Sequence, residues 1–304
     1  MNKIIKGKDV NLFIDGAVVA SSTSCQFTLT GNTADASAKD DPGNGEFDNP
    51  EFVNSSWTAS NESFLVDVNH LLQLLNKTIA GDATVDVSFQ IDGGLSAHGP
   101  AIISQLQLSA PNGDFAKLSL SLEGCGALSF TSASGYVPSV ANSARIKGKA
   151  LMIALGDSSG EYHTLAASTS HTLSVSVQSS EVATKDDNDH YSKKEVTGKS
   201  ISLSTENLVS VDMGGSDVTG IFLERMMSAC SNGETLKMSF GYYAHAIGAP
   251  AGPDVDHGTG TPLLVYGDFL CTSININGAN KENATYSAEF SGKGAPSVGT
   301  SLKA

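Results

Sequence analysis

Charged residues are scarce in this 304-residue chain, where they make up 16% of the sequence against roughly 25% in an average soluble protein. Basic residues are the scarcer kind: 18 Lys and Arg face 32 Asp and Glu, and no long basic run occurs. This balance argues against tight binding to a nucleic-acid backbone. The sequence also lacks an apolar run of about 20 residues, as a membrane helix needs, and an N-terminal signal-peptide pattern. We therefore expect a protein that spans no membrane and folds in a cytoplasm.

Motifs of catalytic or cofactor chemistry are missing as well. No H-E-x-x-H, G-x-S-x-G or Walker sequence occurs, and the four cysteines form no C-x-x-C pair. The cysteines lie in apolar or small-residue stretches, which predicts free, mostly buried thiols in a reducing compartment. They are Cys25, Cys125, Cys230 and Cys271. We predict that the chain is not an enzyme, and that it has no catalytic, cofactor-binding or metal-binding residues.

Two acidic segments resemble calcium sites by composition only. Residues 40–44 and 186–189 lack the glycine and closing glutamate of an EF-hand. A third candidate group lies in a segment rich in Gly and Pro, where a solvated loop is expected. Its members are His245, Asp254, Asp256 and His257. The single tryptophan, Trp57, begins a predicted strand and is expected in the core rather than on a ligand platform.

What the sequence does contain is one internal repeat. Residues 5–8 (IKGK) recur as residues 146–149, an offset of 141, and the offset grows along the chain. At the ends of the two copies it reaches 168, where Gly124 matches Gly292. Matches that keep their order while the offset only grows indicate a tandem duplication with loop insertions.

The duplication predicts two domains, residues 1–143 and residues 144–304. Between about residue 240 and residue 267 the offset increases from 151 to 168, so an inserted loop is expected near residues 244–266. This segment is rich in glycine and proline, as exposed loops are.

Each copy has the pattern of a small β domain with one helix. In the first, Asp15-Gly16 separates two apolar runs, which is a strong hairpin signal. Helical spacing follows, with Leu71, Leu74 and Leu75 on one face, and the last strand alternates Leu with Ser. We predict a mainly β protein: two tandem β-sandwich or partly open barrel domains, each with one packed α-helix. Residues 31–56 and 178–199 are long polar segments at the same place in both copies, and such loops are usually functional.

The ends of the copies carry a family resemblance. Residues 279–297 (ANKENATYSAEFSGKGAPS) and 111–129 (PNGDFAKLSLSLEGCGALS) resemble the closing hairpin of the major tail tube proteins of long-tailed phages of the siphophage type. The shared pattern is a turn with Asn and Gly, an alternating strand, and then Gly-x-Gly. The opening KGKDVNLFIDG also resembles the start of that family. Two features depart from it, because members usually have one such domain and lack the insertion near residues 244–266.

The resemblance implies a structural virion protein that polymerises into the tail tube, a conduit for DNA delivery. Such a protein would be made in the bacterial host cytoplasm and located in the virion tail. Six domains per ring would need only three chains, so we expect a pseudo-hexameric trimer. The implied partners are other copies of the chain, the tail terminator, baseplate and tape-measure proteins, and genomic DNA that passes without tight binding. An acidic lumen would repel its phosphates.

The long polar segments would then reach the neighbouring ring. The candidates for inter-ring contact are charged residues that recur in both copies: Lys39, Asp40, Asp41, Lys185, Asp186 and Asp187. Two solvated charge clusters are the alternative interpretation. The alternative for the whole chain is a secreted tandem β-sandwich adhesin or carbohydrate-binding protein, which low charge favours and a single tryptophan disfavours.

Overall fold

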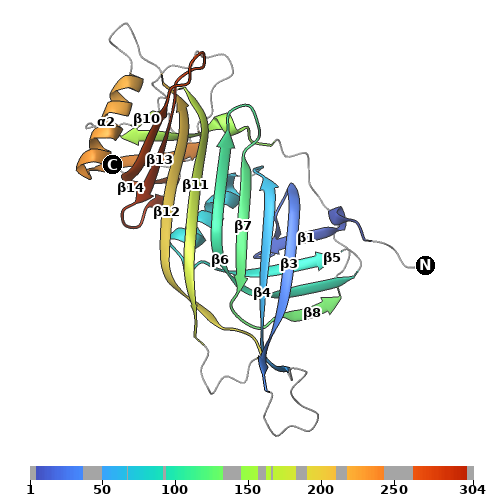
Figure 1. Ribbon diagram of the computed structural model, residues 1–304. Coiled ribbons are helices and arrows are strands. Elements are labelled where there is room, and N and C mark those ends of the chain that lie inside the picture. Colours follow the sequence, from blue (N-terminus) through green and yellow to red (C-terminus); the bar gives the residue numbers. More distant parts are fainter. Residues whose placement is uncertain are drawn as a thin grey trace.

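A computed structural model defines the fold (Figure 1). It describes residues 5–36, 50–66, 68–91, 94–132, 145–156, 162–165, 167–182, 190–209, 218–242 and 263–299. Within these residues, sixteen strands are joined into one hydrogen-bonded network, and every pair of named strands is antiparallel. The network does not close into a barrel, and two helices pack against it, in agreement with the mainly β prediction.

The first repeat holds eight strands and one helix, α1. The elements are β1 (Val10–Ile14), β2 (Ala17–Val18), β3 (Ser22–Asp35), β4 (Pro50–Phe64), α1 (Val68–Ile79), β5 (Thr84–Ile91), β6 (Leu95–Pro111), β7 (Lys117–Gly124) and β8 (Ser129–Ser132). The long strand β6 connects two parts of the hydrogen-bonded network. Its first half pairs with β5 and β8, and its second half pairs with β7.

The second repeat has the same order of elements. They are β9 (Leu151–Gly156), β10 (Tyr162–Thr164), β11 (Ser168–Glu181), β12 (Lys194–Leu208), α2 (Val218–Asn232), β13 (Thr235–Tyr242), β14 (Leu263–Asn277), β15 (Thr285–Gly292) and β16 (Ser297–Val298). Strand β14 takes the part of β6, since it pairs with β13 and β16 through its first half and with β15 through its second. Each repeat begins with a short 3-10 turn, at Gly7–Asp9 and Gly148–Ala150.

The correspondence between the repeats extends to single hydrogen bonds. A β-bulge interrupts β6 at Ser104 and β14 at Thr272, an offset of 168. Both bulge hydroxyls donate to a carbonyl of the next strand, that of Ser121 or Glu289, each at 3.1 Å. These two acceptors are also 168 residues apart. Because a bulge is a defined irregularity of a strand pair, its recurrence fixes the alignment of β6 with β14.

Strands β3 and β11 align in the same way. Thr23 and Thr169, 146 residues apart, donate their hydroxyls to the carbonyls of Glu62 and Glu206. Each pair of strands has a bulge at its start and another near its outer end, again 146 residues apart. The alignment of β3 with β11 is therefore fixed at this offset.

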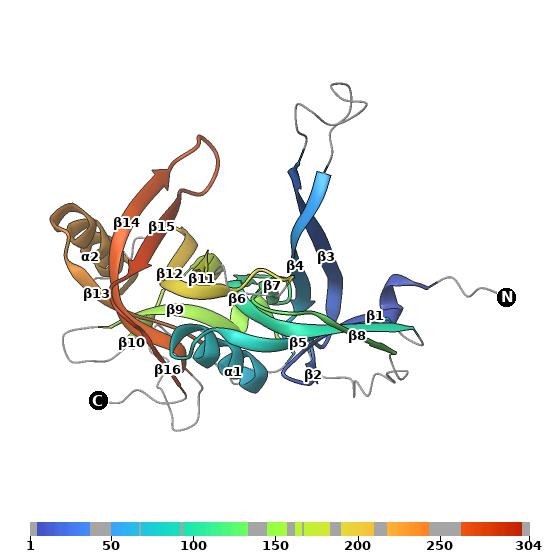
Figure 2. The same cartoon turned by 90° about the horizontal axis from the view of Figure 1, so that it is seen from below.

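The large sheet runs in the order β3–β4–β7–β6–β11–β12–β15–β14, so four strands come from each repeat. Figure 2 shows α1 on one side of its central strands. The β3–β4 and β14–β15 hairpins project on the opposite side, from the two ends of the sheet. The sheet is therefore trough-shaped, with its helix-bearing side convex.

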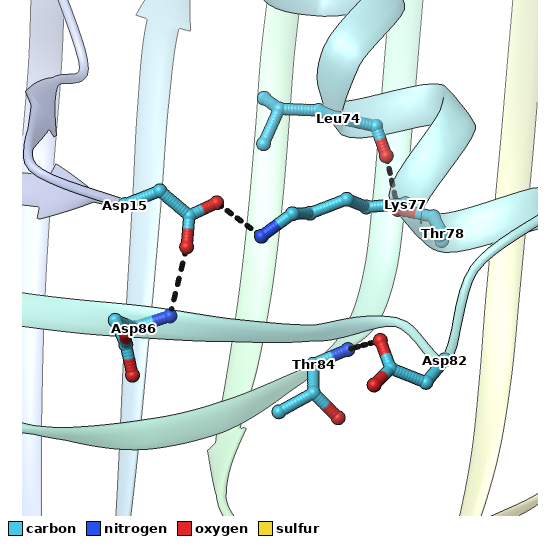
Figure 3. Close-up of polar contacts among 7 residues, drawn as sticks. All are labelled: Asp15, Leu74, Lys77, Thr78, Asp82, Thr84 and Asp86. Atoms are coloured by element: carbon cyan, nitrogen blue, oxygen red, sulfur yellow. Dashed lines mark hydrogen bonds and ion pairs between the residues drawn. The ribbon is translucent and has the colours of Figure 1, made fainter.

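Helix α1 forms as its apolar spacing predicts. Leu71, Leu74 and Leu75 are buried against the sheet. Polar contacts hold the helix to the first hairpin (Figure 3): Lys77 Nζ lies 2.5 Å from Asp15 Oδ2, while Asp15 Oδ1 accepts the backbone N–H of Asp86 at 3.1 Å. Asp15 and Gly16 have φ values of 50° and 78°, as the two-residue turn predicted there requires.

The core confirms one prediction and corrects two. Trp57 is buried, and its Nε1 donates to the carbonyl of Gly126 at 3.2 Å. The cysteines are less enclosed than predicted, because only Cys271 is fully buried and the other three are half-buried. The polar segments 31–56 and 178–199, predicted as loops, are partly strand. Strand pairing continues beyond the core there, and side chains that are polar on both faces give no alternating signal.

Neither of the described helices is long and apolar enough to cross a membrane.

Candidate functional site

The most extended uniform surface is one face of the large sheet, which we call the polar face. Leu108 lies opposite Leu118 on one side and Leu173 on the other, and all three are buried toward α1. Side chains alternate between the two faces of a strand, so the intervening residues point away from the core. On the central strands they are Gln105, Gln107, Ser109, Ser119, Ser121, Thr172, Ser174 and Ser176. The polar face is therefore built mainly of hydroxyl and amide groups.

Few charges interrupt the polar face. Glu62, Glu206 and Glu289 are exposed on it, and Lys117 lies near one end of β7. The carboxylate of Glu123 lies 2.7 Å from Lys194 Nζ. Burial alone would raise the pKa of Glu123, but the hydrogen bond and positive charge of Lys194 bring it below its ordinary value. The face is weakly acidic rather than densely lined with carboxylates.

The junction between the repeats is a pairing of β6 with β11. Leu108 lies opposite Leu173, and Leu106 lies opposite Val175. All four side chains are at most 1% exposed, so the apolar core runs through the junction without a break. The second repeat thus extends the sheet of the first, as an added strand extends a sheet edge.

Polar contacts across this junction come from β11 and β12. Lys194 and Ser179 both bind the Glu123 carboxylate, and Ser179 Oγ donates at 3.1 Å. The Lys199 ammonium donates to the carbonyls of Ile79, at 3.2 Å, and of Gly81. Because these carbonyls lie at the end of α1, Lys199 places a positive charge at the negative end of the helix.

The large sheet has two open edges. Within the described residues, β3 pairs only with β4, and the second half of β14 pairs only with β15. Each edge carries an exposed aliphatic side chain: Leu29 on β3 is 45% exposed and Ile276 on β14 is 48% exposed. Open edges with apolar side chains are sites of strand addition, which monomeric proteins normally block.

Two strand pairs, β3–β4 and β11–β12, extend beyond the core, and we call them the arms. The β3–β4 arm carries Phe52 and Val53, which are 53% and 56% exposed. It is held to the second repeat by a bridge between Ser55 and Tyr191, and the Phe52 ring contacts the ring of His190. The six residues predicted to make inter-ring contacts follow the ends of the arms in sequence and lie outside the described residues. They are Lys39, Asp40, Asp41, Lys185, Asp186 and Asp187.

Titratable groups form no site of chemistry that the described residues reveal. No group of three or more His, Cys, Asp or Glu suited to a metal ion occurs among them. The metal candidates at residues 245 and 254–257 lie outside the described part. His171 is the most perturbed group: burial lowers its pKa to about 3, and its Nδ1 lies 2.9 Å from the Thr205 hydroxyl. It is a neutral core histidine of the second repeat.

Sequence patterns located the repeats but not the open edges. Ile274 and Ile276 match the core positions Leu106 and Leu108 of β6 at the offset of 168, and this was the available signal. Their exposure depends on whether another strand pairs with the outer side of β14, and a periodic pattern does not contain that information.

Two repeats in one continuous sheet, with open edges at both ends, define a structural β protein built to associate. A sequence model of the phage tail tube protein family matches residues 6–130 and 145–298, which together make up most of the chain. The chain therefore belongs to the phage tail tube protein family. It is a structural protein of the virion tail.

Solved tail structures of gene transfer agents are also similar to part of this chain. One is the tail of an empty particle, with 21% identity and a TM-score of 0.36 over 50% of this chain and 97% of that chain. Another is the virion of a native particle, with 21% identity and a TM-score of 0.36 over 51% of this chain and 98% of that chain. No curated protein sequence matches the chain.

Proposed function

We propose that three chains form a closed ring of six repeats, and that such rings stack into a tail tube of the siphophage type. Residues 1–143 and 144–304 are the two proposed domains. The observation that carries the proposal is the β6–β11 junction, because it joins one repeat to the next within a single sheet. If each chain joins the next chain in the same way, a pseudo-hexameric trimer results.

The polar face lines the lumen of this ring. Its hydroxyl and amide groups are uncharged, Lys117 lies only near one end of it, and its glutamates repel phosphates weakly. Genomic DNA would slide through during ejection without tight binding. The tape-measure protein would occupy the same lumen before DNA does.

The arms and the segments beyond them make the contacts between rings. Two features support this assignment: the outer ends of β3–β4 and of β11–β12 extend from the same end of the sheet (Figure 1), and Phe52 and Val53 leave an apolar surface on one of these arms. The charged candidates are those of residues 39–41 and 185–187. A head-to-tail contact between rings does not close on itself, so it yields an open filament. The tail terminator and baseplate proteins would bind at its two ends.

A purely structural role, with no enzymatic activity, follows from this assembly. Electron microscopy of the purified protein tests it: we expect hollow tubes whose rings have threefold symmetry with a sixfold appearance. A persistent monomer that binds to a glycan array would instead support an adhesin and exclude the tube. Tubes with six chains per ring would retain the tube and exclude the trimer.

A further inference from the structure

The internal junction between the repeats predicts how one chain meets the next. We propose that the β14 edge of one chain pairs with the β3 edge of a second copy in one defined antiparallel register. In this register Ile276 lies opposite Phe27, and Ile274 lies opposite Leu29. The inference rests on the proposed ring, since it names the partner surface that closes it.

The first step is the correspondence of the strands. The β6–β11 pair joins an edge strand of the first repeat's half of the large sheet to an edge strand of the second repeat's half. At the end of the chain, β14 is the counterpart of β6 at an offset of 168. At its start, β3 is the counterpart of β11 at an offset of 146. The bulges and their hydroxyl contacts at Ser104, Thr272, Thr23 and Thr169 fix both offsets.

The second step transfers the register. Leu108 opposite Leu173 becomes Ile276 opposite Phe27. On the polar face, the same transfer places Asn275 opposite Thr28, as Gln107 lies opposite Ser174. A slip of one residue would turn the aliphatic side chains to the polar face, so burial of Ile276 selects this register.

The third step concerns burial. At the internal junction Leu108 and Val175 are at most 1% exposed, whereas their counterparts Ile276 and Leu29 are 48% and 45% exposed. Phe27 and Ile274, the remaining members of the two pairs, are half-buried against the core. The two edges therefore lack the one neighbour that the internal junction already has, and a second copy of the chain supplies it.

The two kinds of junction differ in charge. The pair Glu123 and Lys194, which spans the internal junction, corresponds to Ser291 and Pro50 where one chain meets another. The junction between chains therefore lacks this ion pair and rests on apolar contact and strand pairing. Salt should weaken it less than an ionic interface, since only charges are screened.

Paired cysteines on the polar face test the register. Thr28→Cys and Asn275→Cys are introduced into one full-length chain, which is assembled and treated with a short thiol-reactive crosslinker. Residues directly opposite each other have Cβ atoms about 5 Å apart. We expect the monomer band to be converted into a covalent trimer on denaturing gels. Thr30→Cys with Ser273→Cys is a second pair in the same register, in case the first variant does not fold.

Three controls make the result specific. Thr30→Cys with Asn277→Cys is four residues out of register and should stay monomeric on the gel. Thr28→Cys alone would give dimers only if two β3 edges paired with each other. Asn275→Cys alone would give dimers only if two β14 edges paired with each other.

Tubes in which only the out-of-register pair crosslinks would overturn the proposed register and leave the tube function intact. Tubes in which single-cysteine chains give dimers would do the same. A folded protein, verified by circular dichroism, that forms neither rings nor tubes would overturn the tube function together with the inference.

Discussion

His171 occupies a position that cannot hold a charge. It is enclosed in the second repeat, with its Nδ1 at the Thr205 hydroxyl, where the first repeat has Cys25. Because its pKa falls from 6.5 to about 3 on folding, the unfolded chain binds the extra proton throughout the pH range between them. The stability contributed by neutral His171 is complete above pH 6.5 and is lost as the pH falls toward 3.

We therefore expect His171→Gln to flatten the acid dependence of stability. In the wild type, each pH unit below 6.5 removes up to about 1.4 kcal/mol of unfolding free energy through this group. Denaturant titrations at several pH values between 7.5 and 4 would measure the slope. Exposed His98→Gln should keep the slope of the wild type, and an unchanged slope in His171→Gln would contradict the assignment.

Gly124 is required by close packing rather than by backbone conformation. A Cβ at this position would collide with the indole of Trp57, which is buried and hydrogen-bonded to Gly126. We expect Gly124→Ala to lower the unfolding free energy by about 1–3 kcal/mol, as overpacking does. Gly7→Ala, where a Cβ meets nothing within 4 Å, is the control and should change stability by less than about 0.5 kcal/mol in denaturant titrations.

At the scale of strands and helices, sequence patterns predicted the elements that have a local periodic signal and missed the pairing between segments far apart in the chain. The Asp15-Gly16 turn, the leucine face of α1 and the alternating strand β7 were all predictable, because each signal is local. The arms were missed because their side chains are polar on both faces. That β6 pairs with β11, and in which register, was not predicted, since the pairing joins residues 59 to 71 positions apart and no local signal encodes it.

Strand β14 supplies a prediction of its own. Ile276→Lys places a charge on the open edge, as natural proteins do to prevent strand addition. We expect a folded monomer that forms no rings, because the lysine would be buried unpaired at the junction between chains. Met227→Lys, at an equally exposed position on α2, is the control and should still assemble. Analytical ultracentrifugation distinguishes the two; ring formation by Ile276→Lys would contradict the role of this edge.

The internal junction should be sensitive to Glu123. Its lowered pKa means that the ion pair with Lys194 contributes above the ordinary glutamate pKa of 4.5 and is lost as the pH falls below it. We expect Glu123→Gln to cost at most about 1 kcal/mol at pH 7, since the pair is partly exposed. Asp15→Asn breaks the more exposed pair with Lys77 and should cost less. Denaturation midpoints at pH 7 and pH 3.5 would show whether the difference disappears in acid.

At the scale of the whole molecule, the proposed position of the polar face in the lumen predicts how the tube would interact with DNA. Glu206→Lys with Glu289→Lys reverses two charges on that face in every chain. Tubes of this variant should retain duplex DNA at low salt and release it at high salt, because phosphate contacts release counterions. Glu224→Lys with Glu234→Lys makes the same charge change on and next to α2, away from the polar face. Cosedimentation with labelled DNA would compare them, and equal retention by both would place the lumen elsewhere.

The β6–β11 junction also affects the kinetics of assembly. In the proposed ring, half of the contacts between repeats are intramolecular, so they form while each chain folds and do not depend on protein concentration. Three chains come together in two diffusional encounters before the ring closes, where six single-repeat subunits would need five. The reaction order of ring nucleation is thereby halved. Tandem fusion lets rings form at protein concentrations too low for separate repeats to nucleate efficiently.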